Sequence, residues 1–388
     1  MSLSFHDHSR RAAHVVGVAL LATAVPAGAA VSYSLGLDAQ AMAASNPLLL
    51  QGDDLAALLV EGTLRPGMVI SDDGGGTSID LGGALTGRAY SRRYGRYLLG
   101  DAHANASWRH NERLTGTARA EFRRDVSADT LSDAVDASID PRSTRNALDT
   151  SLAFAWTPGT RDTWTPRIQY QRTSFTSSTA LGTTTAAIAD LAYSRRLNAR
   201  TSLGARGAIT SSQARPGGKF LTYALYGTID QRLTPVLRLN AELGAEHSQE
   251  DGRSTLPSGR SADSRTTFSG RGALCADGGR LTGCLNATVA TEISALGALQ
   301  RRFTAGASAA RPIGTRQTIS LVAEYQRAER DGPTAMPTVS AASLRGAFDW
   351  RLAEHVTLSA SLEYRRRDFG SSQSADGGVA GLQFRWTR

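Results

Sequence analysis

Arginine and acidic side chains alternate with apolar ones along most of this sequence, and they are the first candidates for binding chemistry. In the stretch VLRLNAELGAEH (residues 236–247), every second position is leucine or alanine, and Arg238, Glu242 and Glu246 lie between them. In a β-strand, this pattern places the charges on one face and the apolar side chains on the other. A row of guanidinium groups can bind carboxylates and other anions through paired hydrogen bonds.

The same alternation predicts a charged face shared by many strands, and a pore lined by such charges selects solutes. We expect it to favour polar solutes, with anionic and saccharide-like ones among them. A structural alternative stays open, in which arginine–carboxylate pairs fill and stiffen the wall without choosing a solute. The positions predicted to line this face are Arg119, Arg123, Arg167, Arg206, Arg238, Arg271, Arg302, Arg345, Arg365, Glu242, Glu292 and Glu324.

An unusual acidic segment, RRDVSADTLSDAVDASIDPRS (residues 123–143), interrupts the alternation. Its aspartates are Asp125, Asp129, Asp133, Asp136 and Asp140. Leu131, Val135 and Ile139 recur every four residues, which predicts a short amphipathic helix. We expect this segment to fold against the arginine-bearing face as a constriction; an acidic loop in solvent is the alternative.

Cys275 and Cys284 are the two cysteines of the chain, and they flank the segment ADGGRLTG. Pairing them centres a hairpin on Gly279 and Arg280, where a tight turn is favourable. Disulfides persist in exported proteins, and closing this loop would stabilise the fold by roughly 2–3 kcal/mol. Two cysteines alone do not make a metal site, and the sequence predicts neither a metal nor a cofactor.

The histidines suggest a catalytic interpretation at one place. His247 lies near Glu246, Glu250 and Asp251, and an acidic, histidine-bearing group of this kind could serve a surface protease. No glycine-rich phosphate loop follows a strand and opens a helix. We expect no enzyme, and the His247 group is the one enzymatic alternative.

The elements that must position these residues are strands, because apolar positions repeat with a period of two from about residue 76 onward. The repeats make about sixteen strands, roughly one per 20 residues, which is the spacing of a transmembrane barrel. Short links such as RHNER, RLTPV and RLAEH alternate with longer, more polar ones such as SQEDGRSTLPSGRSADS. Short turns that alternate with longer loops are typical of a barrel that crosses a membrane.

The aromatic residues give an independent indication of a membrane. Tryptophan falls on the apolar face, at the short-turn ends of the strands: Trp108, Trp156, Trp164, Trp350 and Trp386. At the opposite strand ends, the same face carries Phe122, Tyr170, Tyr325 and Tyr364. Two aromatic belts are expected at the two interfaces of a bilayer. The sequence therefore predicts an all-β, antiparallel, up-and-down barrel whose apolar face contacts lipid and whose charged face lines a water-filled lumen.

The N-terminus predicts export. Two arginines precede the apolar run AAHVVGVALLATAV, and the small-residue pattern AGA follows at residues 27–29. Residues 1–30 are therefore expected to form a signal peptide that is cleaved after Ala29 or Ala30. No later stretch is apolar for long enough to cross a membrane as a helix.

Residues 31–75 are interpreted as not barrel-like and are expected to precede the barrel, which would occupy residues 76–388. The stretch LLLQGDDLAALLVEG predicts a short helix that is capped by Asp53 or Asp54 and ended by Gly62. Three roles stay open for this segment: a plug of the pore, a contact with a periplasmic partner, or a simple lead into the first strand.

The charge distribution excludes one class of partner. The chain has 43 basic residues against 35 acidic ones, a formal net charge of +8. Lys219 is the sole lysine, and the arginines are spread at strand-like spacing. A nucleic-acid-binding protein usually gathers its basic residues on one face, so no nucleic-acid partner is expected.

Over residues 76–388, this pattern resembles the large, porin-like β-barrels of the Gram-negative outer membrane. The final strand, GGVAGLQFRWTR, is similar to the terminal signal read by the barrel-assembly machinery, although it ends on Arg388 rather than on an aromatic residue. Arginine-rich strands joined by short turns, as in RLTPVLRLNAELGAE, resemble the unassigned barrels that accompany exopolysaccharide export.

The resemblance implies an outer-membrane channel for polar solutes that is surrounded by lipid and lipopolysaccharide and inserted by the barrel-assembly machinery. Association into a homo-oligomer is left open. An export conduit for an acidic exopolysaccharide is the main alternative. A surface enzyme and a structural or adhesive barrel without an open pore are the remaining ones.

Overall fold

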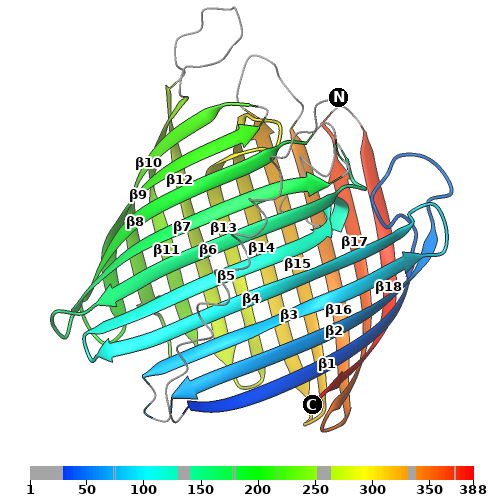
Figure 1. The fold of residues 1–388 in the computed structure, drawn as a ribbon, viewed down its shortest axis with the longest axis horizontal. Helices are drawn as coiled ribbons and strands as arrows, with labels where there is room; N and C mark the ends of the chain where they lie inside the picture. Colours follow the sequence, from blue (N-terminus) through cyan, green and yellow to red (C-terminus); the bar gives the residue numbers. More distant parts are fainter. Residues whose placement is uncertain are drawn as a thin grey trace, which may run out of the picture.

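A computed structural model shows the chain as a closed barrel of antiparallel strands (Figure 1). It describes residues 29–72, 74, 76–129, 140–176, 178, 181–215, 217–250, 264–330, 338–370 and 373–388. Within these ranges, each of 18 strands pairs with its neighbours in the chain, and β1 pairs with β18 to close the sheet. The elements are β1 (Ala29–Ala44), β2 (Ala57–Asp72), β3 (Thr77–Tyr90), β4 (Arg96–Asn111), β5 (Leu114–Val126), the single 3₁₀ turn η1 (Ser127–Asp129), β6 (Thr144–Trp156), β7 (Asp162–Thr176), β8 (Thr183–Arg196), β9 (Thr201–Arg215), β10 (Lys219–Arg232), β11 (Leu237–Glu250), β12 (Ser264–Gly278), β13 (Leu281–Ile293), β14 (Leu299–Ile313), β15 (Gln317–Arg330), β16 (Val339–Ala353), β17 (Val356–Asp368) and β18 (Ser374–Thr387).

The fold class predicted from the sequence is confirmed, because all of these strands belong to one antiparallel, up-and-down barrel. The strands expected from the alternation correspond one to one to β3 through β18. The expected count of about sixteen is too low, since the described residues form 18 strands. The two additional strands, β1 and β2, come from the segment expected to precede the barrel.

The short helix predicted between the Asp53–Asp54 cap and Gly62 is wrong, because β2 begins at Ala57 and the leucines before it lie in the loop between β1 and β2. Apolar and polar residues do not alternate at the start of β2, because both of its faces begin with apolar residues. Leu58 and Val60 are 62% and 60% exposed on the outer face, whereas Leu59 is 5% exposed on the inner one. A short apolar run suits a helix or a strand equally, and pairing with β1 and β3 decides for the strand.

The barrel therefore begins at Ala29 rather than at residue 76. Residues 1–28, most of the predicted signal peptide, lie outside the described residues, so the signal and its cleavage stay predictions. Ala29 and Ala30, the predicted cleavage positions, are the first two residues of β1. No helix in the described part of the chain is long and apolar enough to span a membrane.

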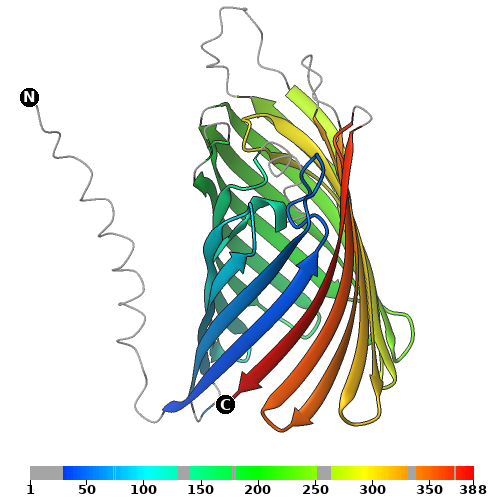
Figure 2. The same cartoon turned by 90° about the vertical axis from the view of Figure 1, so that its right-hand side faces the viewer.

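The first and last strands lie side by side and close the wall (Figure 2). Their pairing runs from Gly36 opposite Thr387 to Ala44 opposite Val379. At the short-turn rim, the backbone N–H groups of Leu35 and Arg388 each donate to the other residue's carbonyl, at 3.0 and 2.9 Å. With this seam closed, no described strand is left with an unpaired edge.

The outer face exposes large apolar side chains that a soluble protein would bury. Leu225 and Leu362 are 67% and 69% exposed, and both alternate with inward-facing polar residues. Aromatic pairs lie on the same face: Trp108 packs edge-on against Phe154, and the Trp164 and Tyr193 rings are 4.7 Å apart. Since a closed sheet pairs its own backbone groups, this face can lie in hydrocarbon.

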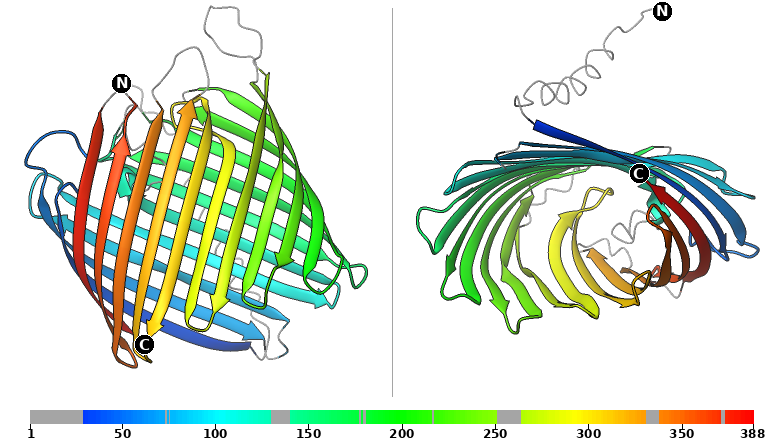
Figure 3. Two further views of the ribbon diagram at one scale, coloured as in Figure 1. Left: turned by 180° about the vertical axis from the view of Figure 1, so that it is seen from behind. Right: turned by 90° about the horizontal axis from the view of Figure 1, so that it is seen from below.

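The connections between strands are short on one rim of the barrel and longer on the other (Figure 1). On the rim that carries the C-terminus, two-residue turns join β4 to β5, β12 to β13 and β16 to β17. On the opposite, outer rim, residues 45–56, 127–143 and 251–263 make the longest connections. Seen along its axis, the wall is a flattened oval (Figure 3), so opposite walls approach each other along its short diameter.

Candidate functional site: the lumen

Strand alternation places the predicted lining residues on the inner face of the wall, opposite the lipid-facing leucines and aromatic residues. Arg238, Arg271 and Glu242 face inward on β11 and β12, where Glu242 pairs in register with Arg271. The others border hollows inside the barrel: Arg119, Arg123, Arg167, Arg206, Arg302 and Glu292 line the first, Arg123, Arg345 and Arg365 line the second, and Glu324 lines the third. Their role in selecting solutes stays a prediction.

Two of these hollows divide the lumen along the long diameter of the oval. The first, about 630 Å³, lies between the β5–β10 wall and β13–β14, and we call it the large chamber. The second, about 420 Å³, lies between β1–β5 and β16–β18, and we call it the small chamber. Arg123 borders both. The third hollow is a recess of about 380 Å³ on β13–β15.

Most inward-facing arginines form ion pairs, and in several of these pairs the arginine is the more exposed partner. Arg302 and Arg365 are exceptions, since each is less exposed than the carboxylates it meets. Arg167 Nε lies 2.8 Å from Asp190, with the side chains 37% and 4% exposed. The Arg271 side chain is 62% exposed, against 8% for its partner Glu242. In the Arg167 and Arg271 pairs, the carboxylates therefore lie against the wall, and the guanidinium groups stand above them in the water of the lumen.

Within the described ranges, two lumen arginines, Arg123 and Arg345, have no carboxylate of their own. Arg123 shares the buried Asp125 with Arg145, at 3.1 and 3.2 Å. Arg345, exposed on β16, has no ion-pair partner among the described residues. These side chains add donors to the lumen surface that local carboxylates do not saturate.

Glu242 is the centre of the largest inner network. Its carboxylate accepts hydrogen bonds from Arg206 on β9 and from Arg271 on β12, the latter at 3.1 Å. The Arg206 guanidinium lies over the Tyr226 ring, 4.6 Å from its centroid. The Tyr226 hydroxyl donates to Glu246, which also accepts the Thr291 N–H at 3.0 Å. The wall from β9 to β13 is thereby cross-linked on its inner side.

The acidic segment turns into the lumen at its first residues. Asp129, at the end of η1, forms an ion pair with Arg88 on β3 and lies 4.0 Å from Arg365 on β17. Arg367, which has no exposed surface, donates to the Ala128 carbonyl at 3.4 Å. Because β3 and β17 lie on either side of the β18–β1–β2 seam, η1 contacts strands on both sides of the barrel closure.

The expected constriction is thus placed only in part. Asp125 and Asp129 contact inner arginines, as described above. Asp140 accepts a hydrogen bond from Ser143 through its backbone carbonyl. Asp133 and Asp136, together with the helix expected over residues 131–139, lie outside the described residues, so their part in a constriction stays a prediction.

A second inward contact was not expected from the sequence: part of the β1–β2 loop lies against η1. Leu48 is fully buried in an apolar cluster with Tyr94, Leu99, Val126 and Ala128. The Pro47 carbonyl accepts a hydrogen bond from Arg365 at 3.1 Å. Tyr94 donates to the Leu55 carbonyl at 2.6 Å, and burial raises the pKa of its hydroxyl. The LLL run at residues 48–50, which precedes the predicted helix, was the signal for this packing.

The loop between β13 and β14 reaches across the outer mouth and contacts the loops that follow β7 and β9. Gly182, after β7, donates its N–H to the Ala295 carbonyl at 2.9 Å, although β13 and β8 are not neighbours in the sheet. Gly217, at φ +149°, approaches Gly297 so closely that a Cβ there would lie 2.6 Å from its Cα. The outer mouth of the lumen is narrowed by loops from two sides, and glycine allows one of these contacts.

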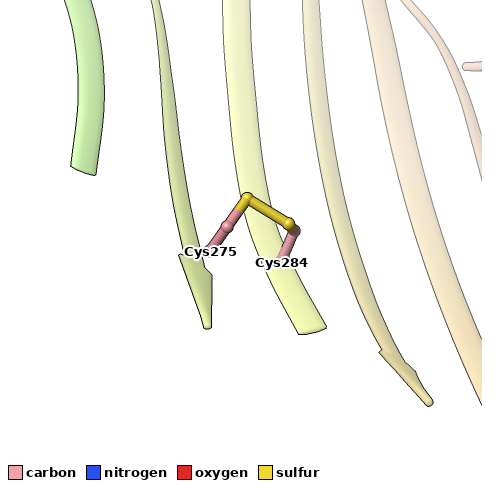
Figure 4. The surroundings of a disulfide bond; sticks show 2 residues. All are labelled: Cys275 and Cys284. Carbon is pink, nitrogen blue, oxygen red and sulfur yellow. A yellow bond between two sulfur atoms is a disulfide. The ribbon is translucent and has the colours of Figure 1, made fainter. Parts of the chain in front are cut away.

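The predicted disulfide between Cys275 and Cys284 is present (Figure 4). The two residues face each other in the β12–β13 pairing, and the turn between the strands is Gly279–Arg280, as expected. Cys275 also pairs in register with Arg238, so the disulfide lies on the inner face of the wall. It fixes this hairpin near the short-turn rim.

The histidine group does not assemble. His247 faces outward and hydrogen-bonds to Thr266 at 2.9 Å and to Gln249 at 3.1 Å, whereas Glu246 faces the lumen. Adjacent residues of a strand point to opposite faces, so His247 and Glu246 cannot act together. Asp251 lies outside the described residues. Among those described, no three His, Cys, Asp or Glu side chains are grouped to hold a metal ion.

No protein-family model matches the sequence, and no curated protein is significantly similar to it. Solved structures with a similar fold include outer-membrane proteins of Acinetobacter baumannii and Pseudomonas aeruginosa. OccAB3 and OccAB2 of Acinetobacter baumannii share 10% and 7% identity with this chain, with TM-scores of 0.46 and 0.48, over 92% of it and 99% and 98% of theirs. OccK8 (OprE) of Pseudomonas aeruginosa shares 9% identity over 92% of this chain and 98% of its own, with a TM-score of 0.46.

At such scores, no function is transferable from those structures. What this chain shows by itself is a closed wall, an apolar outer face with aromatic belts, short turns on one rim and longer loops on the other. These are the features of an outer-membrane β-barrel. The protein is a transmembrane β-barrel of the outer-membrane type.

Proposed function

We propose that the barrel is a channel for polar solutes and that its lumen favours solutes with carboxylate groups or with many hydroxyl groups. The observation that carries this proposal is the difference in exposure within ion pairs such as Arg167–Asp190 and Arg271–Glu242: the guanidinium group meets the water, and its carboxylate is covered. A passing solute therefore contacts hydrogen-bond donors more than acceptors. Carboxylates and sugar oxygens are the acceptors that guanidinium groups bind well.

The buried carboxylates also limit how tightly a solute is held. Asp38, Asp190 and Glu242 each lie beside at least one lumen arginine and balance part of its charge. Conduction requires binding that is favourable enough for entry and weak enough for release. A partly neutralised row of donors meets both conditions, whereas a row of unpaired cations would hold an anion.

The test is the ion selectivity of the purified barrel in planar bilayers, measured as the reversal potential in a potassium chloride gradient. The native channel is expected to prefer chloride. Replacing the exposed Arg119, Arg238 and Arg271 by Gln together should lower the chloride-to-potassium permeability ratio about fivefold, since a unit charge ~4 Å from an ion contributes ~1 kcal/mol in water.

The matched control is Arg311→Gln, which removes an arginine from the outer face of β14 and should leave selectivity unchanged. A native channel that prefers potassium would contradict the proposed anion preference, and a barrel without any conductance would contradict the channel itself.

Export of an acidic polysaccharide makes use of the same donors, so solute size must be tested separately. Added uronic acid monomers should cause brief interruptions of the single-channel current, because they enter and leave the chambers. If only long acidic chains blocked the current, and blocked it from the short-turn side, the export conduit would replace uptake of small solutes as the function.

A further inference from the structure

The outer wall carries a hollow that the channel does not use. It has a volume of about 550 Å³ and lies on the lipid-facing side of β6–β9. Its rim includes Ile168, Tyr170 and Ile209, and its floor includes Ala187 and Ala189. The small side chains leave room between the large ones, so the hollow is an apolar slot in the part of the wall that faces acyl chains.

Basic residues lie directly on the outer-rim side of this slot. Arg172, Thr185, Gln213 and Lys219 are paired in register across β7–β10, and they form one row on the outward face. The adjacent row of the slot begins with Tyr170, two residues from Arg172 and therefore about 7 Å away along the strand. Arg215, opposite Thr183, stands one row further out. Arg172, Arg215 and Lys219 are all exposed.

These three cations have no carboxylate partner in the part of the chain that the structure describes. Two other outward arginines near the outer rim differ in this respect: Arg327 lies 2.6 Å from Glu329, and Arg366 lies 3.0 Å from Asp368. An uncompensated cation beside hydrocarbon is unfavourable unless an anion from outside the protein meets it. Lys219 is also the sole lysine of the chain.

We propose that this face binds one molecule of lipopolysaccharide in the outer leaflet, independently of the solute that the channel passes. Arg172, Lys219 and Arg215 pair with phosphate groups of the lipid A headgroup. Thr185 and Gln213 meet its sugar hydroxyls, and an acyl chain occupies the slot between Ile168 and Ile209. A headgroup with several negative charges suits a row of cations that spans four strands, roughly 14 Å across at ~4.8 Å per interstrand spacing.

A second copy of this chain is the less favourable occupant. In a two-fold contact the same patch meets itself, so Arg172, Arg215 and Lys219 would face their own equivalents. Like charges at such a contact repel each other. A zwitterionic phospholipid would fill the slot but would leave cations of the row unbalanced.

The test uses native mass spectrometry of the purified barrel after addition of diphosphorylated lipid A, its monophosphoryl form, or phosphatidylethanolamine. Wild-type protein should retain one diphosphorylated lipid A per barrel and at least tenfold less phosphatidylethanolamine. Replacing Arg172, Arg215 and Lys219 by Gln should lower lipid A retention at least tenfold. The matched control, Arg327→Gln with Arg366→Gln, should retain lipid A as the wild type does.

Two further measurements separate the site from misfolding and from general lipid contact. Ala187→Leu with Ala189→Leu fills the slot without changing any charge and should also lower retention. Bound lipid A should protect Lys219 from an amine-reactive reagent, as read by peptide mapping. Equal retention by all variants, equal retention of both lipids, or a dimer that forms through this face would each overturn the proposal.

Discussion

Several salt bridges on the inner wall expose the arginine more than its carboxylate, and the proposed selectivity depends on this difference. Sequence alternation alone placed the charged residues on the inner face, because a strand has a strict period of two. It could not tell which arginine meets which acid, since partners such as Arg206 and Glu242 lie on β9 and β11 and are separated by a third strand. Their relative exposure follows from that register and from side-chain length, neither of which a single sequence shows.

Glu242 provides the sharpest test at the scale of one residue. Glu242→Gln removes a buried carboxylate that holds both Arg206 and Arg271. Chloride preference should increase, opposite in sign to the effect of removing the arginines, because two guanidinium groups lose their balancing charge. The free energy of unfolding should fall by about 1–3 kcal/mol, as for other lost hydrogen bonds to charged groups. Reversal potentials and unfolding in urea would measure the two effects.

The control for Glu242 is Asp149→Asn. Asp149 also faces the large chamber, but it accepts hydrogen bonds from Gln169 and Gln171 rather than from arginine. Its replacement should change selectivity and stability less. If Glu242→Gln left the reversal potential unchanged, the arginine pairs would serve only to stiffen the wall.

At the scale of elements, the strands were predictable and the inward-folding loops were not. Alternation identified β3 to β18 because each has a clean apolar face, whereas β1 and β2 were missed. β2 begins apolar on both faces and therefore lacks a clear period of two. β1 does alternate, with Val31, Tyr33 and Leu35 exposed on its outer face, but this short signal directly after the predicted signal peptide was not recognised. The packing of Leu48 against Tyr94 and Val126 joins residues far apart in the chain, and no local pattern reveals such a contact.

The ion pairs of Asp129 hold η1 against the inner wall, and we predict that this contact restricts ion flow through the small chamber. Asp129→Asn removes the ion pair with Arg88 and weakens the contact with Arg365. The turn should then leave the small chamber more often, and single-channel conductance and current noise should both increase. Asp140→Asn is the control, because it removes a charge from the same connection, and only the backbone carbonyl of Asp140 is in contact. Equal conductance of both variants and wild type would show that η1 does not restrict flow.

The whole molecule depends on one pairing that joins its ends. Every other strand pair is formed by consecutive strands, whereas β1 and β18 are separated by nearly the full length of the barrel sequence. Contacts of such separation form late, because the intervening chain must already be ordered. On the inner side of this seam, Asp38 on β1 accepts hydrogen bonds from Arg65 on β2 at 2.7 Å and from Arg385 on β18 at 3.0 Å. One buried carboxylate therefore connects three strands across the closure.

Asp38→Asn should consequently destabilise the barrel more than the loss of an ordinary surface pair does. Both arginines would lose their anion at once, and since they are themselves about half exposed, the expected cost is about 1–3 kcal/mol, less than for a fully buried pair. Unfolding should begin at the seam and become faster. The temperature at which the barrel loses its folded mobility on gels, and its unfolding rate in urea, would measure this effect. Asp80→Asn is the matched control: Asp80 also faces the lumen, but its one ion-pair contact is His103 at 3.7 Å, and both side chains are well exposed. If the two variants unfolded at the same rate, the seam would be held by its backbone pairing alone.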